Sequence, residues 1–124
     1  MRMAHLKVYH YPPCSTCRKA IKWLKAHGHE LTLVNIAERP PGVAELKEMT
    51  SLSGLALRKW FNTSGEVYKR ENLKEVLPNL GEPEQLELLA GNGMLIKRPV
   101  VCSGDAVTVG FREEEYEQIW GQEG

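Results

Sequence analysis

The sequence predicts one α/β domain built on a four-stranded mixed sheet, with elements in the order β-α-β, a helical segment, and β-β-α. Strand-like alternation gives way to helical periodicity within the first 36 residues, and a hairpin followed by a helical pattern closes the chain. A chain of 124 residues has room for a single hydrophobic core. We therefore expect one domain over residues 1–124, with a helical insertion at about 40–92.

The first part of the chain has the pattern of a β-α-β unit. Residues 6–10 alternate like a strand, and Pro12 and Pro13 end it. Gly28 suits the end of the helix that follows, and the branched apolar residues 31–36 predict a buried parallel strand. The helix has one apolar stripe at positions i, i+3, i+4 and i+7, made of Cys17, Ala20, Ile21 and Leu24.

The middle of the chain is mostly helical in pattern. A break at Pro40-Pro41-Gly42 precedes three apolar groupings with helical spacing, and the second of them ends at the turn signal Asn62-Thr63-Ser64-Gly65. The third begins near Pro83, which suits the first turn of a helix. The three groupings are Val43, Leu46 and Met49, then Leu57, Trp60 and Phe61, and then Leu86, Leu89 and Ala90.

The end of the chain predicts a hairpin and a helix. Apolar residues 100–102 and 106–109 flank the turn Ser103-Gly104-Asp105. From Arg112 the pattern is helical, with one apolar face made of Tyr116, Ile119 and Trp120. Without the helical segment, this order of elements is that of the thioredoxin fold, which we predict as the fold of the chain.

Composition excludes several classes of function. Sixteen Lys and Arg balance sixteen Asp and Glu, so no overall charge attracts nucleic acid or an anionic membrane. No segment has the pattern of a signal peptide or the apolar length of a membrane span. Three cysteines are too few for a secreted disulfide framework. We expect a cytoplasmic protein with no direct nucleic-acid or membrane partner.

The pair Cys14-Ser15-Thr16-Cys17 lies between the first strand and the first helix. Backbone N–H groups and the positive end of the helix dipole converge at such a junction and stabilise a thiolate, which is the reactive form of cysteine. Cys17 belongs to the core-facing stripe, whereas Cys14 precedes the helix. We therefore predict that Cys14 is the attacking thiol and that Cys17 can form a disulfide with it.

The motif Lys97-Arg98-Pro99 precedes the first strand of the hairpin. A cis proline at this place in thioredoxin-like folds faces the reactive cysteine and presents its backbone to substrate. If Pro99 is cis, Arg98 lies near Cys14, where its guanidinium lowers the thiol pKa and can hold an oxyanion. Arg98 and Cys14 thus form the predicted site, with the N–H groups of Ser15 and Thr16 as further oxyanion donors.

Three segments of the chain resemble the ArsC/Spx family of thioredoxin-fold proteins, which contains arsenate reductases and Spx-type transcription regulators. They are residues 11–20 (YPPCSTCRKA), 60–65 (WFNTSG) and 93–100 (GMLIKRPV), and together they span most of the chain in the family's order. The resemblance implies that Cys14 is the nucleophile and that Arg98 is the arginine beside the cis proline. It also implies Arg58 as a second oxyanion-binding arginine.

The resemblance implies two functions. The first is an arsenate reductase-like thiol–disulfide oxidoreductase, in which Cys14 attacks a small oxyanion or a protein disulfide and Cys17 resolves the product. It needs no bound cofactor, because glutathione with glutaredoxin, or thioredoxin, restores the thiols. The second is an Spx-like redox switch, in which the Cys14–Cys17 pair controls contact with RNA polymerase. The arsenate reductases usually have no cysteine at the position of Cys17.

Three simpler interpretations accompany these hypotheses. A zinc ion bound by the cysteine pair with His10 is the alternative to redox chemistry, although no second pair has metal-ligand spacing, and we predict no metal. Cys102 continues an apolar strand, where an inert buried thiol is the default and a third redox thiol the alternative. Arg58 suits a solvated helix face as well as an oxyanion contact.

Overall fold

The computed structural model describes residues 5–121. The chain divides into two compact units, the first formed by Met1–Asn35 with Arg98–Gly124 and the second by Ile36–Lys97. The two ends of the chain therefore share one unit, and the predicted helical segment makes up most of the other.

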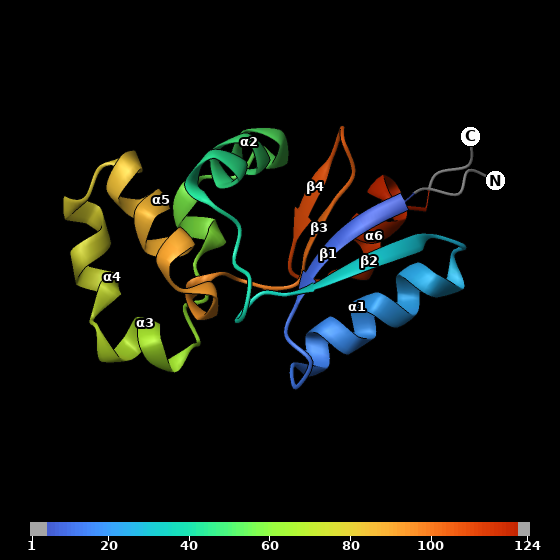
Figure 1. The fold of residues 1–124 in the computed structure, drawn as a ribbon, viewed down its shortest axis with the longest axis horizontal. Coiled ribbons are helices and arrows are strands. Elements are labelled where there is room, and N and C mark those ends of the chain that lie inside the picture. The colour runs from blue at the N-terminus through green and yellow to red at the C-terminus, as the bar shows by residue number, and fades with distance from the viewer. Residues whose placement is uncertain (1–4, 122–124) are drawn as a thin grey trace. The chain divides into compact units, whose positions relative to one another are not determined.

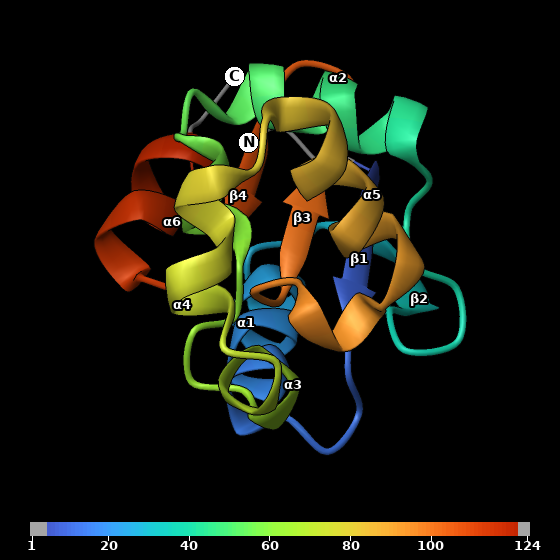
Figure 2. The same ribbon diagram turned by 90° about the vertical axis from the view of Figure 1, so that its left-hand side faces the viewer.

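The first unit contains a four-stranded mixed sheet, as predicted. The strand order is β2-β1-β3-β4, in which β2 is parallel to β1 and the other two neighbouring pairs are antiparallel. The opposite directions of β1 and β3 are visible in Figure 2. The elements of the first unit, shown in Figure 1, are β1 (His5–His10), α1 (Ser15–Ala26), β2 (Glu30–Asn35), β3 (Val100–Cys102), β4 (Val107–Val109) and α6 (Glu113–Ile119).

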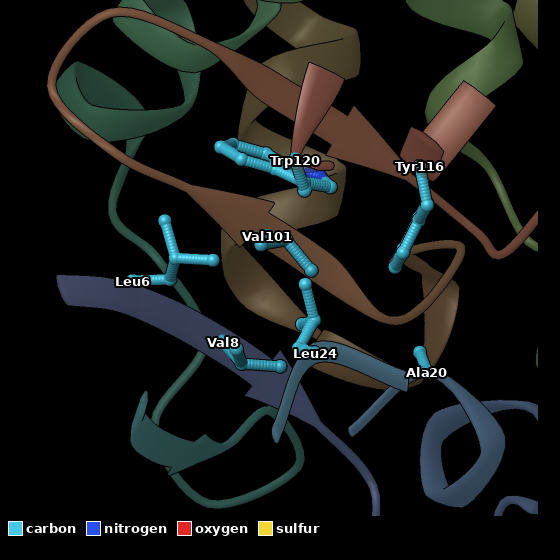
Figure 3. Packing of buried hydrophobic residues seen from close by; sticks show 7 residues of the cluster. All are labelled: Leu6, Val8, Ala20, Leu24, Val101, Tyr116 and Trp120. Atoms are coloured by element: carbon cyan, nitrogen blue, oxygen red, sulfur yellow. The ribbon is translucent and has the colours of Figure 1, made fainter. Parts of the chain in front are cut away.

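The core of this unit lies between one face of the sheet and the helices α1 and α6. The register pairs Val8 with Val101, so both side chains point to the same face of the sheet. Figure 3 shows these strand residues meeting side chains from both helices. The buried cluster consists of Leu6, Val8, Ala20, Leu24, Val101, Tyr116 and Trp120. Residues from both ends of the chain thus complete one core.

Three hydrogen bonds fix the C-terminal helix α6 within the unit. The Tyr116 hydroxyl donates to the carbonyl of Gly110 at 3.0 Å, and the Trp120 indole donates to the Thr108 hydroxyl at 3.0 Å. The third joins Nε2 of His29 and the carbonyl oxygen of Trp120, which are 2.6 Å apart. Because buried polar groups must be paired, these contacts allow the two aromatic residues to enter the core.

Two predictions about burial in this unit are wrong. The strand β2 is parallel to β1 but is not buried, and Leu33 is 42% exposed. It lies at the edge of the sheet, so only part of its surface is covered. Ile119 of α6 is 38% exposed, although Tyr116 on the same helix and Trp120 directly after it are buried.

The second unit is helical, and all three predicted segments are ordered within it. The segment around Leu57 is a single 3-10 turn rather than an α-helix, and two short helices after Gly65 were not predicted. Its elements are α2 (Val43–Ser53), η1 (Leu57–Trp60), α3 (Glu66–Arg70), α4 (Leu73–Val76), η2 (Leu77–Asn79), α5 (Glu82–Gly91) and η3 (Gly93–Leu95).

Trp60 anchors the second unit. Its side chain is fully buried, and its indole N–H donates to the Ser53 hydroxyl at 3.2 Å. Its carbonyl accepts from the N–H of Lys97 at 2.8 Å, and Phe61 forms a β-bridge with Ile96. These bonds tie η1 to the segment that leads into Arg98. None of the helices within residues 5–121 is long and apolar enough to cross a membrane.

Candidate functional site

The candidate site begins where β1 ends and α1 starts. Between them, the N–H of Cys14 donates to the carbonyl of Tyr11 at 2.9 Å and closes a turn that contains Pro12 and Pro13. Prolines supply no N–H and restrict the preceding backbone, so they favour a stop of the strand followed by a turn. The helix α1 begins at Ser15, and Cys14 occupies the N-cap position with extended backbone angles.

The pKa of Cys14 is lowered from its ordinary value. Partial burial raises this pKa, but four other effects together outweigh burial: the backbone N–H and the side chain of Cys17, the charge of Arg98, and the N–H of Thr16. Hydrogen bonds from these two N–H groups, at the start of α1, favour the charged form of the sulfur. Cys14 is half-buried, which leaves part of the residue accessible to a substrate.

Cys17 has the opposite character. It lies on the buried face of α1 and is fully buried, and burial is the main reason why its pKa rises to about 12. The hydrogen bond to Cys14 and the charge of the Cys14 thiolate raise it further. The N–H of Tyr11 donates to the Cys17 sulfur at 3.4 Å, and this hydrogen bond lowers the pKa of Cys17. In this structure all three cysteines are free thiols.

Arg98 and Pro99 enter the site from the start of β3. The peptide bond between them is cis, as expected from the motif. The carbonyl of Pro99 accepts from the N–H of Gly110 at 2.9 Å, which ties the proline to the residue after β4. The charge of Arg98 lowers the pKa of both Cys14 and Cys17, so the arginine and the thiol pair belong to one electrostatic site.

The other predicted residues have different positions. Ser15 and Thr16 are exposed in the first turn of α1, and their role as oxyanion donors stays a prediction. Arg58 is an exposed residue of η1 in the second unit, and its part in the site also stays a prediction. Cys102 is half-buried rather than buried, and its sulfur lies 3.6 Å from the carbonyl of Lys7.

Tyr11 is a member of the site that the sequence pattern did not identify. The Arg98 guanidinium lies over its ring, 5.0 Å from the ring centroid, within the range of a cation–π contact. The sequence shows only a tyrosine before two prolines, and the contact joins residues far apart along the chain. No local signal predicts such a pair.

This arrangement combines an activated thiol, a second thiol and a fixed positive charge. A thiolate is a nucleophile towards an electrophilic sulfur or an oxyanion centre, and a neighbouring thiol is the group that thiol–disulfide exchange requires for a second step. The guanidinium can hold negative charge beside the reacting sulfur. Within residues 5–121, no group of three or more His, Cys, Asp or Glu side chains is placed to hold a metal ion.

The chain is similar to known proteins both as a member of a family and in its match to individual chains. The model of the ArsC family matches residues 9–119. The uncharacterized protein YusI of Bacillus subtilis is 56% identical over 115 residues, which cover 93% of this chain and 98% of YusI. The crystal structure of an ArsC-family-related protein from Bacteroides fragilis has a TM-score of 0.88 at 49% identity, covering 91% of this chain and 95% of that chain.

Two further similar proteins have names that state a function. An arsenate reductase of Neisseria meningitidis serogroup B is 30% identical over 118 residues, which cover 94% of this chain and 99% of the reductase. The regulatory protein MgsR of Bacillus subtilis is 31% identical over 110 residues, which cover 89% of this chain and 86% of MgsR. Similarity at this level thus extends to both a reductase and a regulator.

Proposed function

Since this chain belongs to the ArsC family, we propose that it is a thiol-dependent reductase in which Cys14 is the nucleophile and Cys17 the resolving thiol. The observation that carries this proposal is the unequal pair: the pKa of Cys14 is lowered, while that of Cys17 is raised to about 12. Thiol exchange of this kind needs one thiolate that attacks the substrate and a second thiol that reacts with the mixed disulfide afterwards. The similar arsenate reductase supports an oxyanion among the candidate substrates.

With a disulfide substrate, the Cys14 thiolate attacks one sulfur and the other sulfur leaves as a thiolate that takes up a proton. Cys17 then loses its proton and attacks the Cys14 sulfur, which releases the second substrate thiol and leaves a Cys14–Cys17 disulfide. The two thiols supply the two electrons that the substrate gains. An external dithiol or two glutathione molecules return these electrons to the protein.

With arsenate, the Cys14 sulfur binds arsenic and an arsenate oxygen leaves as water. Attack by Cys17 on the Cys14 sulfur then forms the same disulfide and releases arsenic as arsenite, reduced by two electrons. The Arg98 guanidinium, with the N–H groups of Ser15 and Thr16, stabilises negative charge on the oxyanion. We place Arg58 as an additional oxyanion contact and Pro99 as backbone that contacts the substrate.

The high pKa of Cys17 is compatible with its second step. Part of that high value comes from the hydrogen bond to Cys14 and from the charge of the Cys14 thiolate. Once Cys14 has formed a covalent bond to substrate, its sulfur no longer carries that charge. The pKa of Cys17 then falls, although burial, the main cause of its high value, remains, and this change favours attack by Cys17 after Cys14 has reacted.

The proposal predicts that Cys14→Ser abolishes reduction. Turnover of arsenate with glutathione and glutaredoxin, and of a small disulfide with thioredoxin, falls more than about a thousand-fold, because the covalent route is lost. Cys102→Ser is the matched control, because Cys102 lies outside the thiol pair, and it keeps its turnover. A Cys14→Ser protein that reduces either substrate at the wild-type rate contradicts the mechanism.

A second candidate function is a redox switch that contacts RNA polymerase. The similarity to MgsR and the possession of a second cysteine favour it, because a Cys14–Cys17 disulfide gives two stable states. Recovery of RNA polymerase on the immobilised protein from oxidised and reduced lysates discriminates between the two functions. Equal or absent recovery in both states counts against the switch. Either function suits a reducing cytoplasm, where we place the protein.

A further inference from the structure

Tyr11 contacts all three chemical groups of the candidate site. Its carbonyl accepts from the N–H of Cys14 at 2.9 Å, its N–H donates to the Cys17 sulfur at 3.4 Å, and its ring lies under the Arg98 guanidinium. The first two contacts come from the backbone and exist for any residue at this position. The third comes from the side chain and requires an aromatic ring.

The backbone around Tyr11 is held in place. Pro12 follows it and restricts its backbone to extended conformations. The turn closed by the N–H of Cys14 fixes the carbonyl, and the bond to Cys17 fixes the N–H. The side chain is half-buried. The backbone that carries the ring is therefore fixed, whereas an arginine side chain on its own samples many positions.

A cation–π contact suits an arginine that must also bind an anion. The guanidinium carbon lies over the Tyr11 ring, 5.0 Å from the ring centroid, and the attraction acts between the positive charge and the face of the ring. This attraction is not a hydrogen bond, whereas a carboxylate or another oxyanion pairs with the guanidinium through its N–H groups. The ring thus fixes where the positive charge lies.

We propose that Tyr11 is a positioning residue, whose ring holds the Arg98 guanidinium beside the Cys14 sulfur. This inference deepens the proposed function, because it rests on Cys14 as the nucleophile and Arg98 as its charge partner. The Tyr11 side chain takes no part in covalent chemistry and acts through Arg98. The chemical requirement at position 11 is an aromatic face, and the hydroxyl is dispensable.

The test is the pH dependence of Cys14 alkylation by iodoacetamide, assigned to Cys14 by peptide mass spectrometry. Iodoacetamide is uncharged, so its rate reports the thiolate fraction and not attraction to Arg98. Tyr11→Leu raises the apparent pKa of Cys14, and a rise of about half a unit lowers the alkylation rate about three-fold at pH values below that pKa. Tyr11→Phe and Tyr11→Trp retain the ring and keep the rate within about two-fold of wild type.

A double-mutant cycle with Arg98→Met separates positioning from a general structural effect. In the Arg98→Met background, Tyr11→Leu causes no further rise in the Cys14 pKa, because the group that Tyr11 positions is gone. An equal rise in both backgrounds overturns the proposal, as does an unchanged Cys14 pKa in Tyr11→Leu. If Tyr11→Leu does not give the wild-type circular dichroism spectrum, Tyr11→Met replaces it in the cycle with the same expected results.

The outcome is independent of any substrate. Alkylation needs neither arsenate nor a reducing partner, so it reports on Tyr11 even if turnover is absent. If Cys14→Ser retains turnover while Tyr11→Leu raises the Cys14 pKa through Arg98, the proposed reaction fails and the positioning role stands. If Cys14→Ser abolishes turnover and the cycle shows no coupling, the reverse holds.

Discussion

Cys14 and Cys17 are separated by two residues, yet the protein gives them opposite acid–base properties. Cys14 lies at the start of α1, where N–H groups and Arg98 favour a thiolate, whereas Cys17 lies one turn later on the buried face. Helical geometry contributes to this difference, because residues at the cap and within the apolar stripe have different surroundings, and Arg98 adds its charge. The difference fits the proposed roles of Cys14 as the attacking thiol and Cys17 as the resolving thiol.

Burial of Cys17 predicts a loss of stability at alkaline pH. The pKa of Cys17 is raised to about 12 by burial, and burial also raises the pKa of Tyr116. Groups with a raised folded-state pKa contribute stability that is full below their unfolded-state pKa and is lost as pH rises towards the folded-state pKa. Above about pH 8.5, the free energy of unfolding therefore falls by at most about 1.4 kcal/mol per pH unit for each ionising group.

Urea denaturation between pH 8 and 10.5, with a phosphine reductant present, measures this slope. Cys14 acts in the opposite direction, because its lowered pKa gives stability that grows with pH until its unfolded-state thiol is ionised; it offsets the decline at about pH 8–9 and contributes nothing above that range. Cys17→Ala is the control and shows a shallower decline, since only Tyr116 remains of the two groups. A free energy of unfolding that stays constant over this range argues against a buried, protonated Cys17.

Local patterns explain which site residues were predictable. Cys14 and Cys17 follow from a thiol pair at a junction of strand and helix, and Arg98 follows from its neighbouring proline. Tyr11 was missed because its contact with Arg98 is tertiary, and a tyrosine before two prolines has many ordinary explanations. The half-buried state of Cys102 was missed because an apolar strand does not reveal how much of its surface is covered.

The elements follow the sequence most closely where the signals are local. Gly28 has a φ of 84° just after α1, as expected for the residue that ends a helix. The edge position of β2 depends on the order of strands in the sheet, which no single strand encodes, and so its exposure was not foreseen. The short helices α3 and α4 have four or five residues each, too few for periodicity to be recognised.

Gly93, at the start of η3, has a role that only the structure shows. A Cβ at this position would lie 1.9 Å from the carbonyl oxygen of Ile36, and both residues belong to the second unit. Gly93→Ala therefore forces the backbone apart and lowers the free energy of unfolding by about 1–3 kcal/mol or more. Thermal or urea unfolding measures the change.

Gly91, two residues earlier at the end of α5, is the matched control. A Cβ there meets no atom within 4 Å, so Gly91→Ala leaves stability unchanged or raises it by up to about 1 kcal/mol. Equal stability of the Gly93→Ala and Gly91→Ala proteins would show that Gly93 and Ile36 are not in close contact.

At the scale of the whole molecule, the chain leaves the first unit after β2 and returns to it at Arg98. The return completes the sheet, because β3 pairs with β1, and it brings Arg98 to the thiol pair. The β-α-β and β-β-α patterns are local, so the mixed sheet was predictable. The close packing of each unit was not, because it depends on contacts between distant segments such as Val8 and Val101.

The ArsC family includes proteins named as reductases and regulators that are similar to this chain at about the same level, 30% and 31% identity. Membership therefore supports the site more strongly than it supports either activity. What the two functions share is a thiol at Cys14 that reacts first and a thiol at Cys17 that reacts second. This order of reaction is the central claim about the molecule.

Intact-protein mass spectrometry after reaction with glutathione disulfide tests that order most directly. The wild-type protein is predicted to lose two hydrogens and to form a Cys14–Cys17 disulfide. Cys17→Ser is predicted to accumulate one glutathione on Cys14, because no thiol remains to release it, and Cys14→Ser is predicted to leave Cys17 unmodified. A glutathione adduct on Cys17 of the Cys14→Ser protein, formed as fast as the adduct on Cys14 of the Cys17→Ser protein, would contradict the account.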